Sequence, residues 1–164
     1  MGTLVKFNVS NNDIRAEGGK ALAEALKDNK TMKDLNIASN CLCYNSDYIA
    51  SRERDMSGVI AIGEAIPTMG ALETLDISRN NLGSYNGMDD LGPAIASSKI
   101  TSLNIADNHL YNKGGIKAVV DMLNKGANGT LVKLDISSNF LYAKDTKTIA
   151  EALKGNQTLT ELNI

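Results

Sequence analysis

The sequence of 164 residues has no tryptophan, two prolines, two cysteines and one histidine, and only 4% of its residues are aromatic. Since 43% of the residues are nevertheless hydrophobic, the core must be built mainly from aliphatic side chains. His109 is the single histidine, so a Ser-His-Asp or Cys-His device depends wholly on it. No paired carboxylates or metal-ligand spacings stand out either. We therefore predict that the protein is not an enzyme and has no catalytic residue, metal or other cofactor.

The cysteines and the charge restrict the setting and the partners. Cys41 and Cys43 are separated by one residue and cannot brace a fold, which favours a reducing, cytoplasmic location. A formal net charge of −2 gives no electrostatic footprint for nucleic acid or for an anionic membrane. No apolar run approaches the roughly 20 residues of a membrane helix. We predict a cytoplasmic protein without nucleic-acid or membrane partners.

One pattern returns along the whole chain: a large apolar residue followed by xxLxLxxNxL, where L stands for an apolar residue. Within each copy apolar and polar residues alternate, as in Leu35-Asn36-Ile37, which predicts a half-buried strand. We expect strands near residues 7–9, 35–37, 75–77, 103–105, 134–136 and 162–164. The asparagine of the pattern is Asn12, Asn40, Asn80, Asn108 and Asn139 in the five full copies.

A second pattern follows each of these turns and has helical period, as in Ala21, Leu22, Ala25 and Leu26. Each unit is therefore predicted to be a strand, a turn, a helix and a return loop. The asparagine amide is short enough to hydrogen-bond backbone groups that no neighbouring strand can reach. We expect the stacked units to form an asparagine ladder.

These motifs resemble the ribonuclease-inhibitor-like class of leucine-rich repeats, over essentially the whole chain. That class has units of about 28 residues with a true helix on the outer side, and both Asn12 to Asn40 and Asn80 to Asn108 span 28 residues. The resemblance implies an α/β fold: a right-handed leucine-rich-repeat solenoid of about five and a half repeats, with a curved parallel sheet inside and helices outside. We expect one domain, residues 1–164.

The spacing departs from the class at two places. Asn40 to Asn80 spans 40 residues, so twelve residues are inserted, at about residues 43–57. Asn108 to Asn139 spans 31 residues, and we expect the three extra residues in the Lys125–Gly129 loop. Neither end has an evident polar cap, although terminal repeats normally need one. Two interpretations stay open, a fragment of a longer array or a chain that associates with itself end to end.

The resemblance implies a protein–protein interaction scaffold, because similar repeats occur in adaptor and sensor proteins. They also occur in GTPase-activating proteins for Ran and in actin-capping tropomodulins. The alternative is therefore a regulatory domain that acts on a small GTPase or on actin. Function depends on sites carried by a fold, so the repeats do not decide between these activities.

Three surfaces are candidates for partner binding: the concave sheet, an aromatic rim where the strands run out toward the helices, and the insertion. Each has a competing structural interpretation, respectively a solvated sheet face, aromatic cover for the ends of the core, and a tolerated surface loop. His109 holds the same repeat position as Asn81 and Phe140, which is typical of a rim residue. The candidate contact residues are Tyr44, Tyr48, Arg52, Arg54, Asp76, Tyr85, His109, Tyr111, Asp135, Phe140 and Tyr142.

Overall fold

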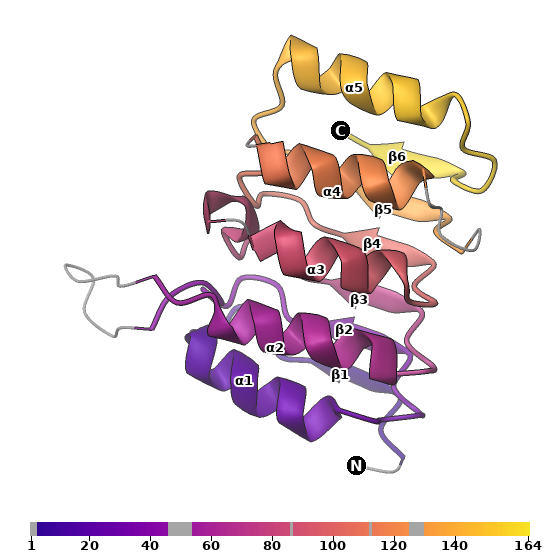
Figure 1. Ribbon diagram of the computed structural model, residues 1–164. Helices are drawn as coiled ribbons and strands as arrows, with labels where there is room; N and C mark the ends of the chain where they lie inside the picture. The colour runs from indigo at the N-terminus through magenta and orange to yellow at the C-terminus, as the bar shows by residue number, and fades with distance from the viewer. Residues whose placement is uncertain (1–2, 46–53, 86, 112, 125–129) are drawn as a thin grey trace.

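The computed structural model describes residues 3–45, 54–85, 87–111, 113–124 and 130–164, apart from the side chains of Ser84 and Tyr85. Six strands form one parallel sheet in chain order (Figure 1). They are β1 (Lys6–Asn8), β2 (Asp34–Asn36), β3 (Thr74–Asp76), β4 (Ser102–Asn104), β5 (Lys133–Asp135) and β6 (Glu161–Asn163). Each strand begins and ends one residue before the range expected from the sequence.

Five α-helices alternate with the strands and lie side by side on one face of the sheet (Figure 1). They are α1 (Arg15–Leu26), α2 (Ser57–Ala65), α3 (Gly87–Ala96), α4 (Lys113–Asn124) and α5 (Ala143–Leu153). Two short 3-10 helices are also present: η2 (Ile66–Thr68) directly follows α2, and η3 (Leu82–Tyr85) precedes α3. The predicted α/β repeat solenoid, with a parallel sheet on one side and helices on the other, is confirmed.

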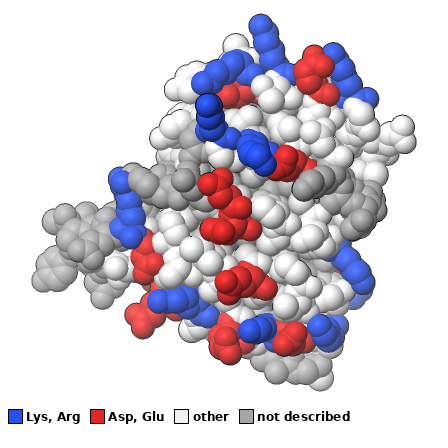
Figure 2. Space-filling model, in the orientation of Figure 1, with Lys and Arg blue, Asp and Glu red and all other residues white. Residues whose placement is uncertain are grey.

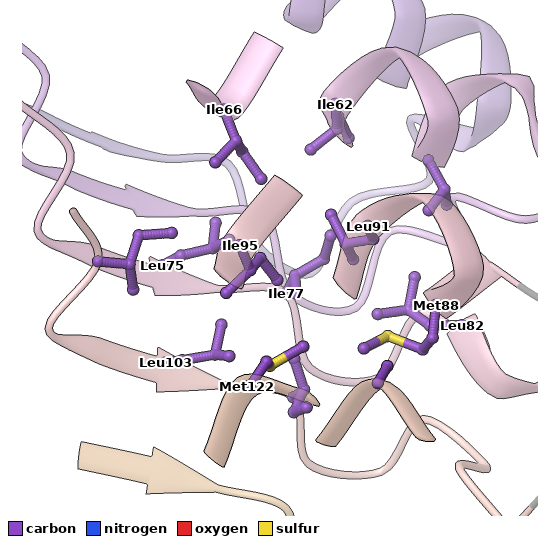
Figure 3. Close-up of a cluster of buried hydrophobic side chains, with 14 of the residues drawn as sticks. Ile62, Ile66, Leu75, Ile77, Leu82, Met88, Leu91, Ile95, Leu103 and Met122 are labelled. Atoms are coloured by element: carbon purple, nitrogen blue, oxygen red, sulfur yellow. The ribbon is translucent and has the colours of Figure 1, made fainter. Parts of the chain in front are cut away.

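The core is a continuous aliphatic layer between the sheet and the helices. The central leucines of β2 to β5 are in register, for example Leu75 with Leu35 and with Leu103, and all are buried. Figure 3 shows how Leu75 and Ile77 from the strand side meet helix residues such as Ile95. Burying one such side chain stabilises the fold by about 1.5–3 kcal/mol relative to exposing it. Repetition of the pattern therefore supplies both the shape and the stability.

The insertion leaves the stack between β2 and α2. Tyr44 and Arg54 form an isolated antiparallel bridge at its base, and the N–H of Asp55 donates to the carbonyl of Cys43 at 3.0 Å. Residues 46–53, which include Tyr48 and Arg52, lie outside the described residues, as does the 125–129 loop. Within the described part of the chain, no helix combines the length and the apolar character that crossing a bilayer requires.

Candidate partner-binding surfaces

The turn asparagines connect each repeat to the next. Asn80 Nδ2 donates to the carbonyls of Ile37, Ile77 and Ser78 at 3.0–3.1 Å. Asn80 Oδ1 accepts the N–H of Asn40 at 3.0 Å, and Asn108 Oδ1 accepts the N–H of Asn80 at 2.8 Å. Asn40, Asn80, Asn108 and Asn139 are all buried. Because buried backbone groups without partners are costly, this ladder fixes the register of the repeats.

The ladder is incomplete at the first repeat, although Asn40 Nδ2 still donates to the carbonyl of Val9 at 3.0 Å. Asn12 is exposed and donates only to the nearby carbonyls of Val9 and Ser10, at 2.8 and 3.1 Å. Asn40 Oδ1, which would accept the N–H of Asn12 in a regular stack, is buried and has no partner among the described residues. The first turn also differs in backbone, since Arg15 has a positive φ there in place of Asp13. Asn12 is therefore not a member of the ladder that the structure forms.

The residues on either side of each ladder asparagine adopt left-handed backbone conformations. His109 and Phe140, directly after Asn108 and Asn139, have φ values of 59° and 56°. Cys41 and Asn81 hold the same position in earlier repeats, with φ of 53° and 59°. Phe140 is exposed, whereas Cys41, Asn81 and His109 are half-buried. The left-handed position thus accepts different residues, and it exposes the side chain most in the last full repeat.

The exposed face of the sheet carries a central row of asparagine and aspartate whose oxygens are used locally. Asn36 Oδ1 accepts the N–H of Ala38 at 3.0 Å, and Asp76 Oδ1 accepts the N–H of Ser78 at 3.0 Å. The same bond recurs along the row from Asn8 to Asp135. These side chains close the turn that follows each strand, so their first role is structural.

The sheet face is hollowed and polar, with a cavity of about 410 Å³ whose lining includes Asp76, Arg79 and Asp135. Burial raises the pKa of Asp135, but hydrogen bonds from Ser137 and Asn163 outweigh it and hold that pKa below its usual range. Arg79 and Asp107 form an ion pair at 3.7 Å across neighbouring repeats. Asp76 and Asp135 are therefore on one surface, but it offers no large apolar anchor.

Four ring-bearing residues of the last two full repeats form what we call the aromatic rim: His109, Tyr111, Phe140 and Tyr142. His109 stacks on Phe140 with ring centroids 5.4 Å apart, and Tyr111 meets His109 edge to face at 6.5 Å. Tyr111, Phe140 and Tyr142 are 45%, 61% and 61% exposed. Apolar rings so exposed do not serve chiefly to cover the core.

Earlier repeats do not extend this rim. The residues equivalent to Tyr111 and Tyr142 in earlier repeats are Arg15, which is half-buried, and Cys43 and Gly83, which are buried. A Cβ atom on Gly83 would lie 2.1 Å from the carbonyl oxygen of His109, so no aromatic side chain fits there. Among the side chains that the structure describes, the exposed aromatic ones therefore lie at the end of the stack that contains α4 and α5.

The remaining predicted contact residues lie apart from the rim. Tyr44 is half-buried and its hydroxyl accepts a hydrogen bond from Asn81 Nδ2 at 3.0 Å. Arg54 is exposed at the base of the insertion. Tyr48 and Arg52, and the side chain of Tyr85, fall outside the described residues. The structure thus groups His109, Tyr111, Phe140 and Tyr142, and it places Tyr44 and Arg54 on a separate part of the edge.

One surface was missed by the sequence interpretation, a groove between α4 and α5 with a volume of about 390 Å³. Tyr111, Ile116, Val120, Lys113, Lys117 and Lys144 are among its lining residues. The signal that could have revealed it is Val120. In α2 and α3 the residue after the buried Ile62 and Leu91 is a glycine, whereas in α4 the residue after the buried Val119 is Val120. A branched residue replaces glycine at that helix position.

Reactive chemistry has little support in the described part of the chain. Burial, reinforced by the neighbouring Cys41, raises the pKa of the Cys43 thiol to about 12, so it stays protonated and unreactive. The described His, Cys, Asp and Glu residues form no group of three or more that could hold a metal ion. The surfaces that the fold presents are suited to contact with another molecule.

Comparison with known proteins agrees with the geometry. Residues 3–23 and 96–117 match a family model described as Leucine Rich repeat, and residues 71–93 match a second model of the same description. None of the curated proteins matches the chain.

Two solved structures are similar in fold. One is leiomodin-1 actin-binding site 2, with a TM-score of 0.65 and 20% identity over 92% of this chain and 79% of that chain. The other is the tropomodulin C-terminal domain from Caenorhabditis elegans, with a TM-score of 0.58 and 18% identity over 92% of this chain and 83% of that one. The repeat pattern, the parallel sheet with its outer helices and the family matches together identify this chain as a leucine-rich-repeat protein.

Proposed function

We propose that this chain is a non-catalytic protein-binding domain that contacts its partner through the aromatic rim. The observation that carries the proposal is the exposure of Tyr111, Phe140 and Tyr142 on adjacent repeats. Tyrosine residues are enriched among the residues that dominate binding energy, and aromatic rings supply large contact area with few rotatable bonds. A partner that covers them removes apolar surface from water at about 25 cal/mol per Å².

The rim is also ordered before binding, which lowers the entropic cost of association. His109 and Phe140 stack on each other, and each follows a buried ladder asparagine. Tyr142 is the N-cap residue of α5, and its N–H donates to Asp145 Oδ2 at 3.0 Å. The rings are therefore carried on backbone that the repeat stack holds in place.

The sheet face is the weaker candidate. The oxygens of Asn36, Asp76, Asn104 and Asp135 already accept turn N–H groups. The described lining of the hollow on this face contains no tryptophan, tyrosine or large aliphatic side chain. Polar contacts there would add specificity for a basic partner, with less apolar burial to drive binding.

Actin is the first partner to test, because one similar structure is described as an actin-binding site. Cosedimentation with filaments and inhibition of pointed-end growth are the direct assays. Regulation of a small GTPase stays a prediction from the repeat family, and stimulated GTP hydrolysis would test it. We further assign the repeats to the ribonuclease-inhibitor-like class, because an α-helix follows each of the first five strands.

Affinity capture from the source cells separates the two faces. The unmodified protein is compared with a rim variant, Phe140→Asn with Tyr142→Ser, and with a sheet-face variant, Asp76→Lys with Asp135→Lys. A partner retained by the unmodified protein and the sheet-face variant, but lost by the rim variant, supports the proposal. A partner lost only by the sheet-face variant contradicts it, provided that both variants keep the native circular dichroism spectrum.

A further inference from the structure

We propose that the groove between α4 and α5 binds an acidic amphipathic helix of a partner protein. This inference goes beyond the aromatic rim, because the groove lies on the helical side of the molecule. It has a volume of about 390 Å³. Recognition of a helix by its apolar face in such a groove is a recurrent mode of protein binding.

The groove has an apolar floor supplied by α4. Ile116 is 7% exposed and Val120 is half-buried, and Tyr111, which belongs to the rim, also lines the groove. Thr148 of α5 lines the opposite wall. On α4 the lining residues run from Lys113 to Val120, roughly 12 Å at 1.5 Å per residue, enough to contact about two turns of a bound helix.

In α2 and α3 a glycine stands at the helix position that Val120 holds in α4. A Cβ on Gly92 would lie 2.7 Å from the Cβ of Ala118, so glycine lets α3 and α4 approach closely. A Cβ on Gly63 would lie 3.6 Å from the Cα of Leu91, so α2 and α3 are also in contact at this position. Val120 takes this place in α4. Its branched side chain lines the groove and remains partly open to solvent.

The charges at the groove favour an acidic ligand. Lys113 and Lys117 line it from α4, and Lys144 lines it from α5. Lys117 is paired with Asp121, whereas no salt bridge to Lys113 or Lys144 is found within the described ranges. Asp145 is the one carboxylate among the described lining residues; it is 5% exposed and accepts the N–H of Tyr142. Figure 2 shows basic side chains, interspersed with acidic ones, over the end of the helical face where α4 and α5 lie, and mainly acidic ones over its middle.

Two of these lysines are poorly placed for helix stability. Lys113 is the first residue of α4 and Lys144 is the second residue of α5. A positive charge near a helix N-terminus is opposed by the helix dipole, which favours anions there. Both the lysines and the dipoles therefore attract carboxylates to this end of the groove.

The other hollows on the helical face differ in charge. The hollow between α1 and α2 contains Lys20 and Lys27 together with Glu24 and Glu64, so its charges balance. The hollow between α3 and α4 includes Asp89 and Asp121 beside Lys117. Only the α4–α5 groove, among these three in the described part of the chain, joins an apolar floor to an excess of lysine.

The test uses a displayed library of helices about three turns long, the average length in globular proteins, with leucines on one face and Glu, Gln or Lys at the flanking positions. Selected helices are synthesised and titrated against the intact protein by fluorescence anisotropy. We expect enrichment of Glu, and a loss of affinity of about tenfold or more on Lys144→Glu, equivalent to about 1.4 kcal/mol. Val120→Glu, which places a carboxylate in the floor, is expected to lose at least as much.

Lys147→Glu is the matched control, since Lys147 is exposed on the same helix and is absent from the groove lining. Phe140→Asn tests independence from the rim, and both controls are expected to keep the affinity within about twofold, equivalent to about 0.4 kcal/mol. If Val120→Glu does not fold, Lys113→Glu replaces it. A library that yields no binder, binders without enriched Glu, or affinities unchanged by Lys144→Glu would overturn the inference, whatever the outcome for the rim.

Discussion

The imidazole of His109 stacks on the ring of Phe140 across two successive repeats, with an angle of 25° between the ring planes. Both residues follow a ladder asparagine and both have a positive φ. The same backbone geometry that closes the core turn therefore aligns rings from different repeats on one surface. Asn81 shows that the position does not need an aromatic residue to form the turn.

Phe140→Asn should remove partner binding without unfolding the protein. A left-handed conformation costs most residues about 1–2 kcal/mol, whereas asparagine tolerates it. Loss of the ring pair costs about 0.5–1.5 kcal/mol, so the two effects nearly cancel. We expect the free energy of unfolding to change by less than about 1 kcal/mol, as measured by urea denaturation. A large destabilisation would show that Phe140 is a core residue.

Asn108→Ala should be strongly destabilising. The substitution removes donors to Ile77 and Ile105, and it leaves the buried N–H groups of Asn80 and Leu82 without their acceptor. Each unsatisfied buried group costs about 1–3 kcal/mol, so we expect a loss of about 3 kcal/mol or more in urea unfolding.

Asn12→Ala is the matched control for the ladder, because Asn12 is exposed and bonds only within its own turn. Its loss should cost about 1 kcal/mol or less. Equal effects at the two positions would contradict the interrupted ladder.

Lys144→Glu should stabilise the protein while it weakens helix binding in the groove. Replacing a cation by an anion in the first turn of α5 favours the helix dipole, by typically 0.3–1 kcal/mol at low ionic strength. Thermal denaturation in low salt measures this gain, and added salt should reduce it. A loss of stability would mean that Lys144 serves the fold.

Stability should fall in acid partly through Asp135. Hydrogen bonds from Ser137 and Asn163 lower its pKa in the folded state against the opposing effect of burial. The stabilisation is present above the ordinary aspartate pKa of about 3.9 and is lost as the pH falls through the lower folded value. Asp135→Asn keeps a side-chain oxygen that can accept the N–H of Ser137, but asparagine does not titrate. Its unfolding free energy should therefore decline less between about pH 5 and pH 2, and an unchanged decline would exclude Asp135 as a contributor.

Cys41 should react with iodoacetamide before Cys43 in the folded protein. Cys43 is 1% exposed and its pKa is raised to about 12 by burial and by Cys41, so the nucleophilic thiolate is scarce near neutral pH. Peptide mass spectrometry after alkylation at about pH 8 checks the order. Equal labelling in the native state would show that this part of the core opens.

The sequence predicts most of the fold because each repeat contains the apolar spacing of its own strand and helix. Alternation around Leu35 and helical spacing around Leu22 predict the strand and the helix, and a recurring asparagine marks the turn. The rim residues were also predicted, because they share repeat positions. A motif within one repeat does not predict how the side chains and backbone of neighbouring repeats fit together.

Three features depend on that match. Asn12 has the motif residue yet lies outside the ladder, because its turn has a different backbone. Asn81 bonds to Tyr44 across 37 residues of sequence. The groove depends on how α4 and α5 are placed, and Val120 lines it at a position where α2 and α3 have glycine. Each requires the relative placement of two repeats, which side-chain volume and backbone contacts decide.

Photo-crosslinking tests the central claim most directly. Benzoylphenylalanine is placed at Phe140 in one protein and, as a matched control, at Asn36 on the sheet face in another, and both are irradiated with the source-cell extract. If the rim is the contact surface, Phe140 gives a discrete adduct with a protein that also binds the unmodified chain, and Asn36 gives little of it. An adduct of that partner formed from Asn36 and not from Phe140 would place recognition on the sheet and contradict the account.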